Sequence, residues 1–394
     1  MAALARQDRP EVSAHQLRFA SEASLNAISS DRKLMYHNPS ASQWRAENQL
    51  NQSVLAFHRT LPSYAHTPLL EISGPLADTV GLHRIFLKDE SNRFGLPAFK
   101  ILGASWASYR AVLKHLDIPP DTPIEAIKHA ARGNNVSLYA STEGNFGRAV
   151  ARMATLLGVT ACIYVPTIMV EDTQALIKGE GAEVVKVDDN YDSTVHKAAE
   201  DAAAIEGAIL VQDDAWEGYE EVPAWVVEGY STMLTEIDEQ LHAAGCDGPD
   251  LVVVPVGVGS LAQATVSHFK AKGKEKVPRV LAVEPESAAC LKNSLKAGKS
   301  VTIETGETNM CGMNCGTVSS LAWPVLRDGV DASLTVSEAE ADDASNMFEQ
   351  IGVRTGPCSS GTLAALLKAC RDARDALHWD SRSCVVLFGT EGLR

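Results

Sequence analysis

The chain has 394 residues, 45% of them hydrophobic and 22% charged, and its 35 basic and 50 acidic residues give a formal net charge of −15. This length allows two domains or one elaborate domain with a large core. The acidic charge argues against nucleic acid or an anionic membrane as the main partner. Because no apolar run is long enough for a signal peptide or a membrane span, we expect a cytoplasmic protein. Eight cysteines in so long a chain do not indicate a disulfide scaffold.

The first predicted elements lead to a lysine at position 100. The first 60 or so residues are polar and weakly patterned, with a turn signal at Asn38-Pro39, and we expect them to wrap the outside of the fold. A short buried strand is predicted at 84–87, and apolar residues recur at helical spacing after Lys100. Lys100 is therefore expected where a strand, a tight turn and a helix meet.

Lys100 is flanked by Phe99 and Ile101, so we expect partial desolvation, which disfavours the ammonium form of its side chain. A neutral amine at such a position can form a Schiff base with an aldehyde. The alternative is a surface lysine whose aliphatic stem packs on the helix. The local sequence alone favours this alternative, so the choice depends on the rest of the chain.

Downstream, short apolar strands alternate with amphipathic helices, with an interruption at 117–132 that contains three prolines. This alternation is typical of parallel sheets covered by helices. We predict an α/β protein of two interleaved three-layer domains with mainly parallel sheets: a large domain of residues 1–104 and 215–394, and a smaller mobile domain of residues 105–214. The further strands are predicted at 137–141, 160–165, 183–187, 208–212, 251–256, 279–283 and 384–388, and the helices at 146–157, 172–179, 194–205, 223–244, 261–270, 338–350 and 361–376.

Ligands of such folds lie beyond the carboxyl ends of the strands, so the loops there are the candidate sites. After the strand at 137–141 the chain reads Ser141-Thr142-Glu143-Gly144-Asn145 and enters a helix. The hydroxyls, the glycine and the helix N-terminus can bind an anion such as a substrate carboxylate, and Asn145 can donate to a phenolate oxygen. Glu143 is a candidate for proton transfer. The alternative is a capped turn without a ligand.

Two adjacent carboxylates, Asp213 and Asp214, follow the strand at 208–212. They could hold an ammonium group, act as an acid, or lie in a hydrated turn.

The loop Gly257-Val258-Gly259-Ser260-Leu261 follows the most apolar strand and leads into a helix, as a phosphate cradle does. It lacks the third glycine of a dinucleotide fingerprint. Glu284, at the end of the next strand, nevertheless keeps a nicotinamide-dependent dehydrogenase as an alternative.

The last strand is followed by Gly389-Thr390-Glu391-Gly392, in which the Thr390 hydroxyl could bind a neutral ring nitrogen. Ser359 and Ser360 could do the same or cap their helix. Cys311 and Cys315 could suggest a metal clip, but zinc needs further ligands at defined spacing. We therefore predict no metal and expect these thiols to pack near a cleft.

An aldehyde-reactive lysine, a phosphate cradle, an oxygen-binding asparagine and a hydroxyl for a ring nitrogen together specify pyridoxal phosphate. At these residues the chain resembles the diaminopropionate ammonia-lyase family, within the fold type II (tryptophan synthase β-like) pyridoxal phosphate enzymes. The resemblance runs from about 57 to 392 and is most specific at 88–100 and 212–223.

The resemblance implies a role for each matching position. Lys100 becomes the Schiff-base lysine, Asn145 approaches the phenolic oxygen of the cofactor, residues 257–262 bind its phosphate, Thr390 meets the pyridine nitrogen, and Asp213 lies near the β-amino group of the substrate. The expected enzyme is a homodimeric carbon-nitrogen lyase that converts 2,3-diaminopropionate to pyruvate and ammonia by α,β-elimination.

The chain departs from the family pattern at three positions. Glu143 and Phe146 stand where the family usually has aspartate and histidine, and Gln263 stands where glycine is common. The preference for D- or L-substrate therefore stays open. Two alternatives also stay open: elimination or β-replacement on another β-substituted amino acid in a specialised pathway, and a non-catalytic amino-acid-binding protein.

Overall fold

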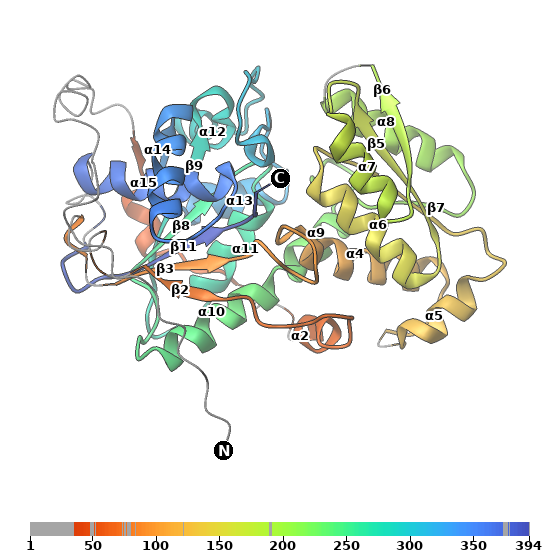
Figure 1. Cartoon of the computed structure of the whole chain (residues 1–394), viewed down its shortest axis with the longest axis horizontal. Helices are drawn as coiled ribbons and strands as arrows, with labels where there is room; N and C mark the ends of the chain where they lie inside the picture. Colours follow the sequence, from red (N-terminus) through yellow and green to blue (C-terminus); the bar gives the residue numbers. More distant parts are fainter. Residues whose placement is uncertain are drawn as a thin grey trace.

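Two sheets lie side by side in the computed structural model, each covered by helices (Figure 1). Both sheets are wholly or mainly parallel, which confirms the predicted α/β class. The structure describes residues 35–47, 51, 53–72, 74, 76, 80–82, 84–120, 122–188, 191–372, 377 and 379–393. The prediction for residues 1–34 lies outside this range.

The larger sheet has seven strands in the order β1-β10-β9-β8-β11-β3-β2, of which the two edge strands are antiparallel to their neighbours. Its strands are β1 (Met35–His37), β2 (Leu69–Glu71), β3 (Arg84–Asp89), β8 (Leu251–Pro255), β9 (Arg279–Pro285), β10 (Ala332–Val336) and β11 (Cys384–Gly389). In the central strand β8, Val252 and Val254 join the core on one face while Leu251 and Val253 join the core on the other. This two-sided burial explains why the strand reads as a continuous apolar run.

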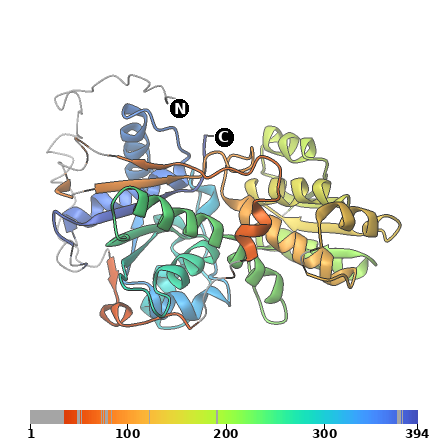
Figure 2. The ribbon, with the colours of Figure 1, turned by 90° about the horizontal axis from the view of Figure 1, so that it is seen from below.

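The smaller sheet is formed by β4 (Ser137–Ser141), β5 (Thr160–Pro166), β6 (Glu183–Val187) and β7 (Ala208–Leu210), in the order β6-β5-β4-β7 and all parallel. All four strands come between β3 and β8 in sequence, so the two sheets are interleaved along the chain. Figure 2 shows the smaller sheet and its helices beside the larger one. The predicted domain boundaries at 105 and 214 stay a prediction.

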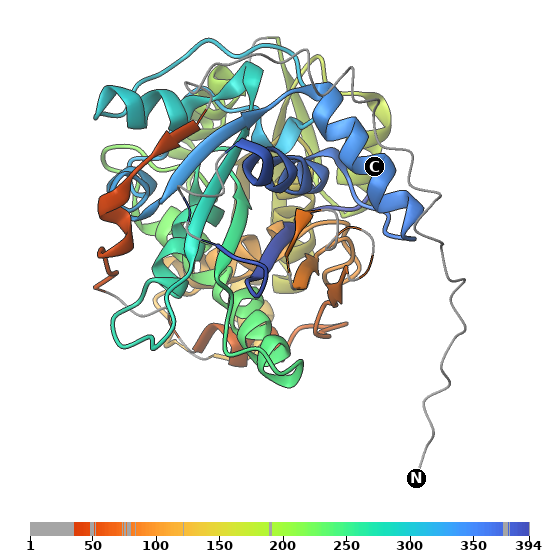
Figure 3. The same ribbon diagram turned by 90° about the vertical axis from the view of Figure 1, so that its left-hand side faces the viewer.

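Helices cover both faces of the larger sheet (Figure 3, with the larger part in front). α14 and α15 pack on one face, and α10, α11 and α13 pack on the other. The helices are α2 (Ser53–His58), α4 (Lys100–His115), α5 (Ile124–Ala131), α6 (Asn145–Leu157), α7 (Glu171–Gly179), α8 (Tyr191–Ala204), α9 (Glu221–Gly229), α10 (Ser231–Ala243), α11 (Ser260–Phe269), α12 (Cys290–Ala297), α13 (Ala322–Gly329), α14 (Glu338–Gln350) and α15 (Pro357–Asp372).

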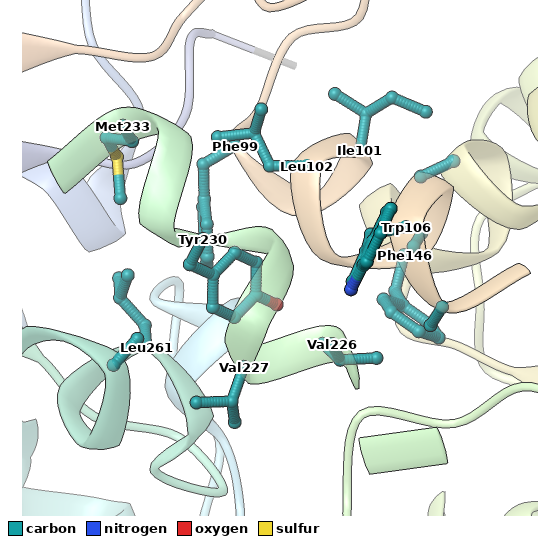
Figure 4. Close-up of a cluster of buried hydrophobic side chains, with 14 of the residues drawn as sticks. Phe99, Ile101, Leu102, Trp106, Phe146, Val226, Val227, Tyr230, Met233 and Leu261 are labelled. Carbon is teal, nitrogen blue, oxygen red and sulfur yellow. The ribbon is translucent and has the colours of Figure 1, made fainter. Parts of the chain in front are cut away.

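The single helix predicted at 223–244 is wrong, because α9 and α10 meet at Tyr230. At this break α9 lies directly against α4: a Cβ on Gly229 would be 2.4 Å from the carbonyl oxygen of Leu102. The Tyr230 ring packs against Phe99, with ring centroids 4.9 Å apart (Figure 4). This contact joins segments far apart in sequence, so local spacing does not report it.

Other differences concern short elements. The predicted interruption at 117–132 contains the helix α5, which begins after Pro123. β1 and β2 were not predicted because each has three residues at the sheet edge. β10 was not predicted because Ser333 and Thr335 alternate with its apolar residues, although all five of its residues are buried.

Candidate functional site

Lys100 lies in a turn that is fastened to the chain after β11. β3 and β11 are parallel neighbours along their whole length. Beyond them, the Phe99 N–H donates to the Thr390 carbonyl at 3.2 Å, and the Gly392 N–H donates to the Pro97 carbonyl at 3.0 Å. These bonds hold Lys100 and Thr390 together beyond the carboxyl ends of two neighbouring strands, β3 and β11.

The side chain of Lys100 forms a partly buried ion pair. Its Nζ donates to Asp213 Oδ2 at 2.5 Å and lies 5.4 and 5.8 Å from the ring centroids of Phe99 and Phe146. Burial favours the neutral amine, but the Asp213 carboxylate outweighs it, so the pKa of Lys100 lies above its ordinary value. The predicted loss of the ammonium form is therefore wrong, because the flanking residues say nothing of a carboxylate that lies 113 positions away.

Thr142 organises the loop between β4 and α6. Its Oγ1 accepts hydrogen bonds from the N–H groups of Gly144 at 2.8 Å and Gly147 at 2.9 Å. Gly144, with φ of 140°, is the N-cap of α6 and provides no side-chain cap. Thr142 thus caps the Gly147 N–H, whereas the N–H groups of Asn145 and Phe146, at the very start of α6, lack intrahelical partners and can bind an anion.

The glycines after β8 allow a close approach of two loops. A Cβ on Gly257 would be 2.8 Å from the Gly312 carbonyl oxygen, and Gly259 has φ of 98°. α11 begins at Ser260 without a side-chain cap, so its first N–H groups also lack intrahelical partners. The loop and the helix N-terminus together can hold a phosphate group.

Gln212 joins the segments that carry the remaining predicted residues. Its Oε1 accepts from the Ser141 N–H at 3.0 Å, and its Nε2 donates to the Tyr191 hydroxyl at 2.9 Å. Gln212 thereby ties the end of β4 to the start of α8, and the next residue, Asp213, reaches Lys100.

One pocket brings the strand-end loops together. It measures about 840 Å³ including its open mouth. The predicted site residues in its wall are Lys100, Thr142, Glu143, Gly144, Asn145, Asp213, Gly257, Val258, Gly259, Ser260, Leu261 and Thr390. Ser141 is the exception: it is fully buried behind the wall, and its hydroxyl forms no hydrogen bond to a described residue.

The pocket wall also contains residues that the sequence analysis did not propose. Glu391 is buried there, and its Oε2 accepts from Asn145 Nδ2 at 3.1 Å. Tyr191, at the start of α8, also lines the pocket. The signal available in the sequence was the place of Glu391 in the motif already noted for Thr390.

Glu284 does not lie where a dehydrogenase needs it. The residue is fully buried, and its carboxylate accepts from the N–H groups of Leu291 at 2.6 Å and Lys292 at 2.8 Å, at the start of α12. The carboxylate is thus occupied with a helix N-terminus and does not line the pocket. This removes the observation that favoured a nicotinamide cofactor.

The thiols of Cys311 and Cys315 line the pocket, as predicted for thiols near a cleft. None of the eight cysteines, all of which lie in the described ranges, forms a disulfide bond. Within the part of the chain that the structure describes, no group of three or more His, Cys, Asp and Glu side chains is arranged to hold a metal ion. None of the helices described there is long and apolar enough to cross a membrane.

Comparison with known proteins agrees with this site. The family model described as pyridoxal-phosphate dependent enzyme matches residues 60–389. The diaminopropionate ammonia-lyase of Salmonella typhimurium is 34% identical over 366 residues, which cover 87% of this chain and 89% of the relative. That of Escherichia coli K12 is 36% identical over 275 residues, 69% of this chain and 68% of the relative.

A solved structure shares the fold. The crystal structure of diaminopropionate ammonia-lyase from Escherichia coli in complex with D-serine superposes with a TM-score of 0.81 at 28% identity. The match covers 91% of this chain and 93% of that one. The resemblance found in the sequence is therefore confirmed, and so is the expected fold type.

Proposed function

Because this chain belongs to the diaminopropionate ammonia-lyase family of pyridoxal-phosphate-dependent enzymes, we propose that it converts 2,3-diaminopropionate to pyruvate and ammonia by α,β-elimination. Pyridoxal phosphate is its cofactor. The named activity of the relatives and the chemistry of the pocket support the proposed reaction.

The residues present fit this cofactor. The loop 257–261, which lines the pocket, and the N-terminus of α11 suit its phosphate. Lys100 suits the aldehyde, Asn145 the phenolic oxygen and Thr390 the ring nitrogen, and all three line the pocket. When bound, pyridoxal phosphate withdraws electrons from the substrate's α-carbon.

Lys100 and Asp213 are suited to proton transfer. The amine of Lys100 must lose a proton before it can react, and Asp213 Oδ2, at 2.5 Å, can accept that proton. The neutral amine can then remove the α-proton of the substrate. Asp213 or a neighbouring group can return a proton to the departing β-amine.

The charged groups in the pocket wall support 2,3-diaminopropionate as the substrate. Glu143, Asp213 and Glu391 line the wall together, next to the N-terminus of α6. 2,3-Diaminopropionate has two amino groups and one carboxylate. Glu143 and Asp213 suit the amino groups, while Thr142 and the N-terminus of α6 suit the carboxylate.

A second candidate is elimination or β-replacement on another β-substituted amino acid. The observation that favours it is Phe146, whose ring centroid lies 5.8 Å from Lys100 Nζ, at a position where the family usually has histidine. Glu143 also carries a longer side chain than the aspartate it replaces. Both changes alter the wall next to the reacting atoms.

We extend the proposal to the whole protein. We propose that the smaller domain, residues 105–214, moves toward the larger one when substrate binds, which closes the pocket and excludes water during the reaction. Eight cysteines without a disulfide bond among them suit the reducing cytoplasm, where we place the enzyme. We propose a homodimer, as the family resemblance implies, and light scattering on the purified protein tests it.

Substrate profiling tests the proposed reaction. The cofactor-loaded protein is given a panel of β-substituted amino acids of both hands, and keto-acid release is followed. We expect pyruvate and ammonia from diaminopropionate. No release from diaminopropionate, together with turnover of another β-substituted amino acid, would contradict the proposal in favour of the second candidate.

A further inference from the structure

Glu391 is joined to the pocket by two different sets of bonds. Its backbone N–H donates to Ser359 Oγ at 3.1 Å, and its carbonyl accepts from the Gly356 N–H at 2.9 Å. Its side chain accepts from the Cys358 N–H through Oε1 at 3.4 Å and from Asn145 Nδ2 through Oε2 at 3.1 Å. The backbone bonds hold the residue in place, so the side chain can be changed without removing them.

In the hydrogen bond between Asn145 and Glu391, Asn145 must be the donor. A carboxylate only accepts hydrogen bonds, so the amide nitrogen of Asn145, and not its carbonyl oxygen, must face Glu391. An amide can otherwise turn over and exchange these two ends. Since Nδ2 carries a second N–H, one donor remains for a ligand in the pocket.

We propose that Glu391 is a positioning residue that fixes the amide orientation of Asn145, so that Asn145 donates to the cofactor. This inference rests on the proposed function, because the donor matters only if Asn145 meets the phenolic oxygen. Asn145 begins α6 and Glu391 follows β11, so the contact also joins the two sheets across the pocket.

Glu391→Gln is the sharpest variant. The carbonyl oxygen of the new amide can still accept from the Cys358 N–H, which leaves its NH₂ group facing Asn145. Asn145 then has to present its oxygen, so its amide turns over and its donor moves. The substitution keeps the size of the side chain and all backbone bonds of residue 391.

The experiment is a double-mutant cycle on cofactor affinity. The apoproteins of the wild type, Glu391→Gln, Asn145→Ala and the double variant are titrated with pyridoxal phosphate, and Kd is read from the visible absorption band. We expect each single variant to bind about tenfold more weakly, as for loss of one hydrogen bond to a charged group. The double variant should also bind about tenfold more weakly, because Glu391 acts through Asn145. Glu221→Gln, an exposed residue paired with Lys114, is the control for loss of one charge and should keep the wild-type Kd.

Two results would overturn the inference: a wild-type Kd for Glu391→Gln, or independent effects that multiply to about a hundredfold in the double variant. A wild-type Kd for Asn145→Ala would also overturn it, by removing the contact through which Glu391 acts. Failure of the wild-type protein to bind pyridoxal phosphate would instead contradict the proposed function, so the two failures are distinguishable.

Discussion

Two lysines of the same strand-turn-helix segment, the fully buried Lys88 and the partly buried Lys100, differ in what their ammonium groups contact. Lys88 Nζ donates to the Thr67 carbonyl at 2.9 Å, Glu236 Oε2 at 2.8 Å and Gln240 Oε1 at 2.8 Å. These partners use all three N–H groups of the ammonium. Lys100 donates to Asp213 alone among the described residues, and it faces a pocket.

The pKa values of the two lysines move in opposite directions. Burial lowers the pKa of Lys88, even though Glu90 and Glu236 lie close, and Arg93 lowers it further. For Lys100 the Asp213 carboxylate outweighs burial and raises the pKa. Burial alone therefore does not identify the reactive lysine, because Lys88 is more deeply buried than Lys100 but has a structural role.

Lys88 belongs to a buried network of charged side chains next to the turn between β3 and α4. Arg93 donates to Glu90 at 2.6 Å and to Glu236 at 2.7 Å, and the side chains of Lys88, Glu90, Arg93 and Glu236 are all fully buried. Each charge has an opposite charge beside it, as burial requires. The network holds the turn that leads to Lys100, whereas the pair of Lys100 and Asp213 opens into the pocket.

The comparison is tested most strongly by replacing each lysine with alanine. Lys100→Ala removes the amine that binds the cofactor and transfers a proton, so we expect activity to fall more than about 10³-fold. We expect Lys88→Ala to lower stability instead, with the activity of the folded fraction largely kept. Steady-state kinetics and urea unfolding on both variants check this. If Lys100→Ala kept more than about a tenth of the wild-type activity, Lys100 would not be the reactive lysine.

Removing Glu236 should have the second largest effect. Glu236→Ala leaves Lys88 and Arg93 without their shared carboxylate, and breaking such a buried pair costs about 3–5 kcal/mol of unfolding free energy. Urea denaturation measures the cost. A loss below about 1 kcal/mol would show that the network does not support the turn.

Glu236 also makes the free energy of unfolding depend on pH. The pKa of Glu236 is lowered to about 2, because its hydrogen bonds and charges to Arg93 and Lys88 outweigh the effect of burial. A carboxylate with a lowered folded pKa stabilises the protein above its unfolded pKa of about 4.3 and loses this contribution as pH falls toward 2. Unfolding free energies measured between pH 5 and 2 should fall less steeply in Glu236→Gln than in the wild type.

Asp213→Asn should have a smaller effect on catalysis than loss of Lys100. Since the carboxylate raises the pKa of Lys100, the amide should lower it, and the apoprotein should react with pyridoxal phosphate at lower pH than the wild type. Turnover should nevertheless fall about 10²-fold, because a proton-transfer group is lost. An unchanged pH midpoint would contradict the assigned ion pair.

The smallest effect is expected at a third lysine pair. Lys114 and Glu221 form an ion pair between α4 and α9, with side chains 64% and 54% exposed. Because exposed pairs contribute little, Lys114→Met should change stability by less than about 1 kcal/mol and leave activity unchanged. Stability and kinetics measured as for the other variants provide the check.

Local sequence patterns predicted the strand-end loops well, because glycines, hydroxyls and helix starts act through neighbouring backbone. The sequence also predicted that these distant loops share one ligand, but it did not predict the individual contacts between them. The effect of Asp213 on Lys100 spans 113 positions, and the bond from Asn145 to Glu391 spans 246. Ser141 was predicted in the site because it ends the strand at 137–141, but its side chain is fully buried and does not line the pocket.

The central claim is that Lys100, and not Lys88, binds pyridoxal phosphate covalently. Borohydride reduction of the cofactor-loaded protein, followed by peptide mapping with mass spectrometry, tests it most directly. We predict a single pyridoxyl label on Lys100. A label on Lys88 or another lysine, or no label at all, would contradict the claim.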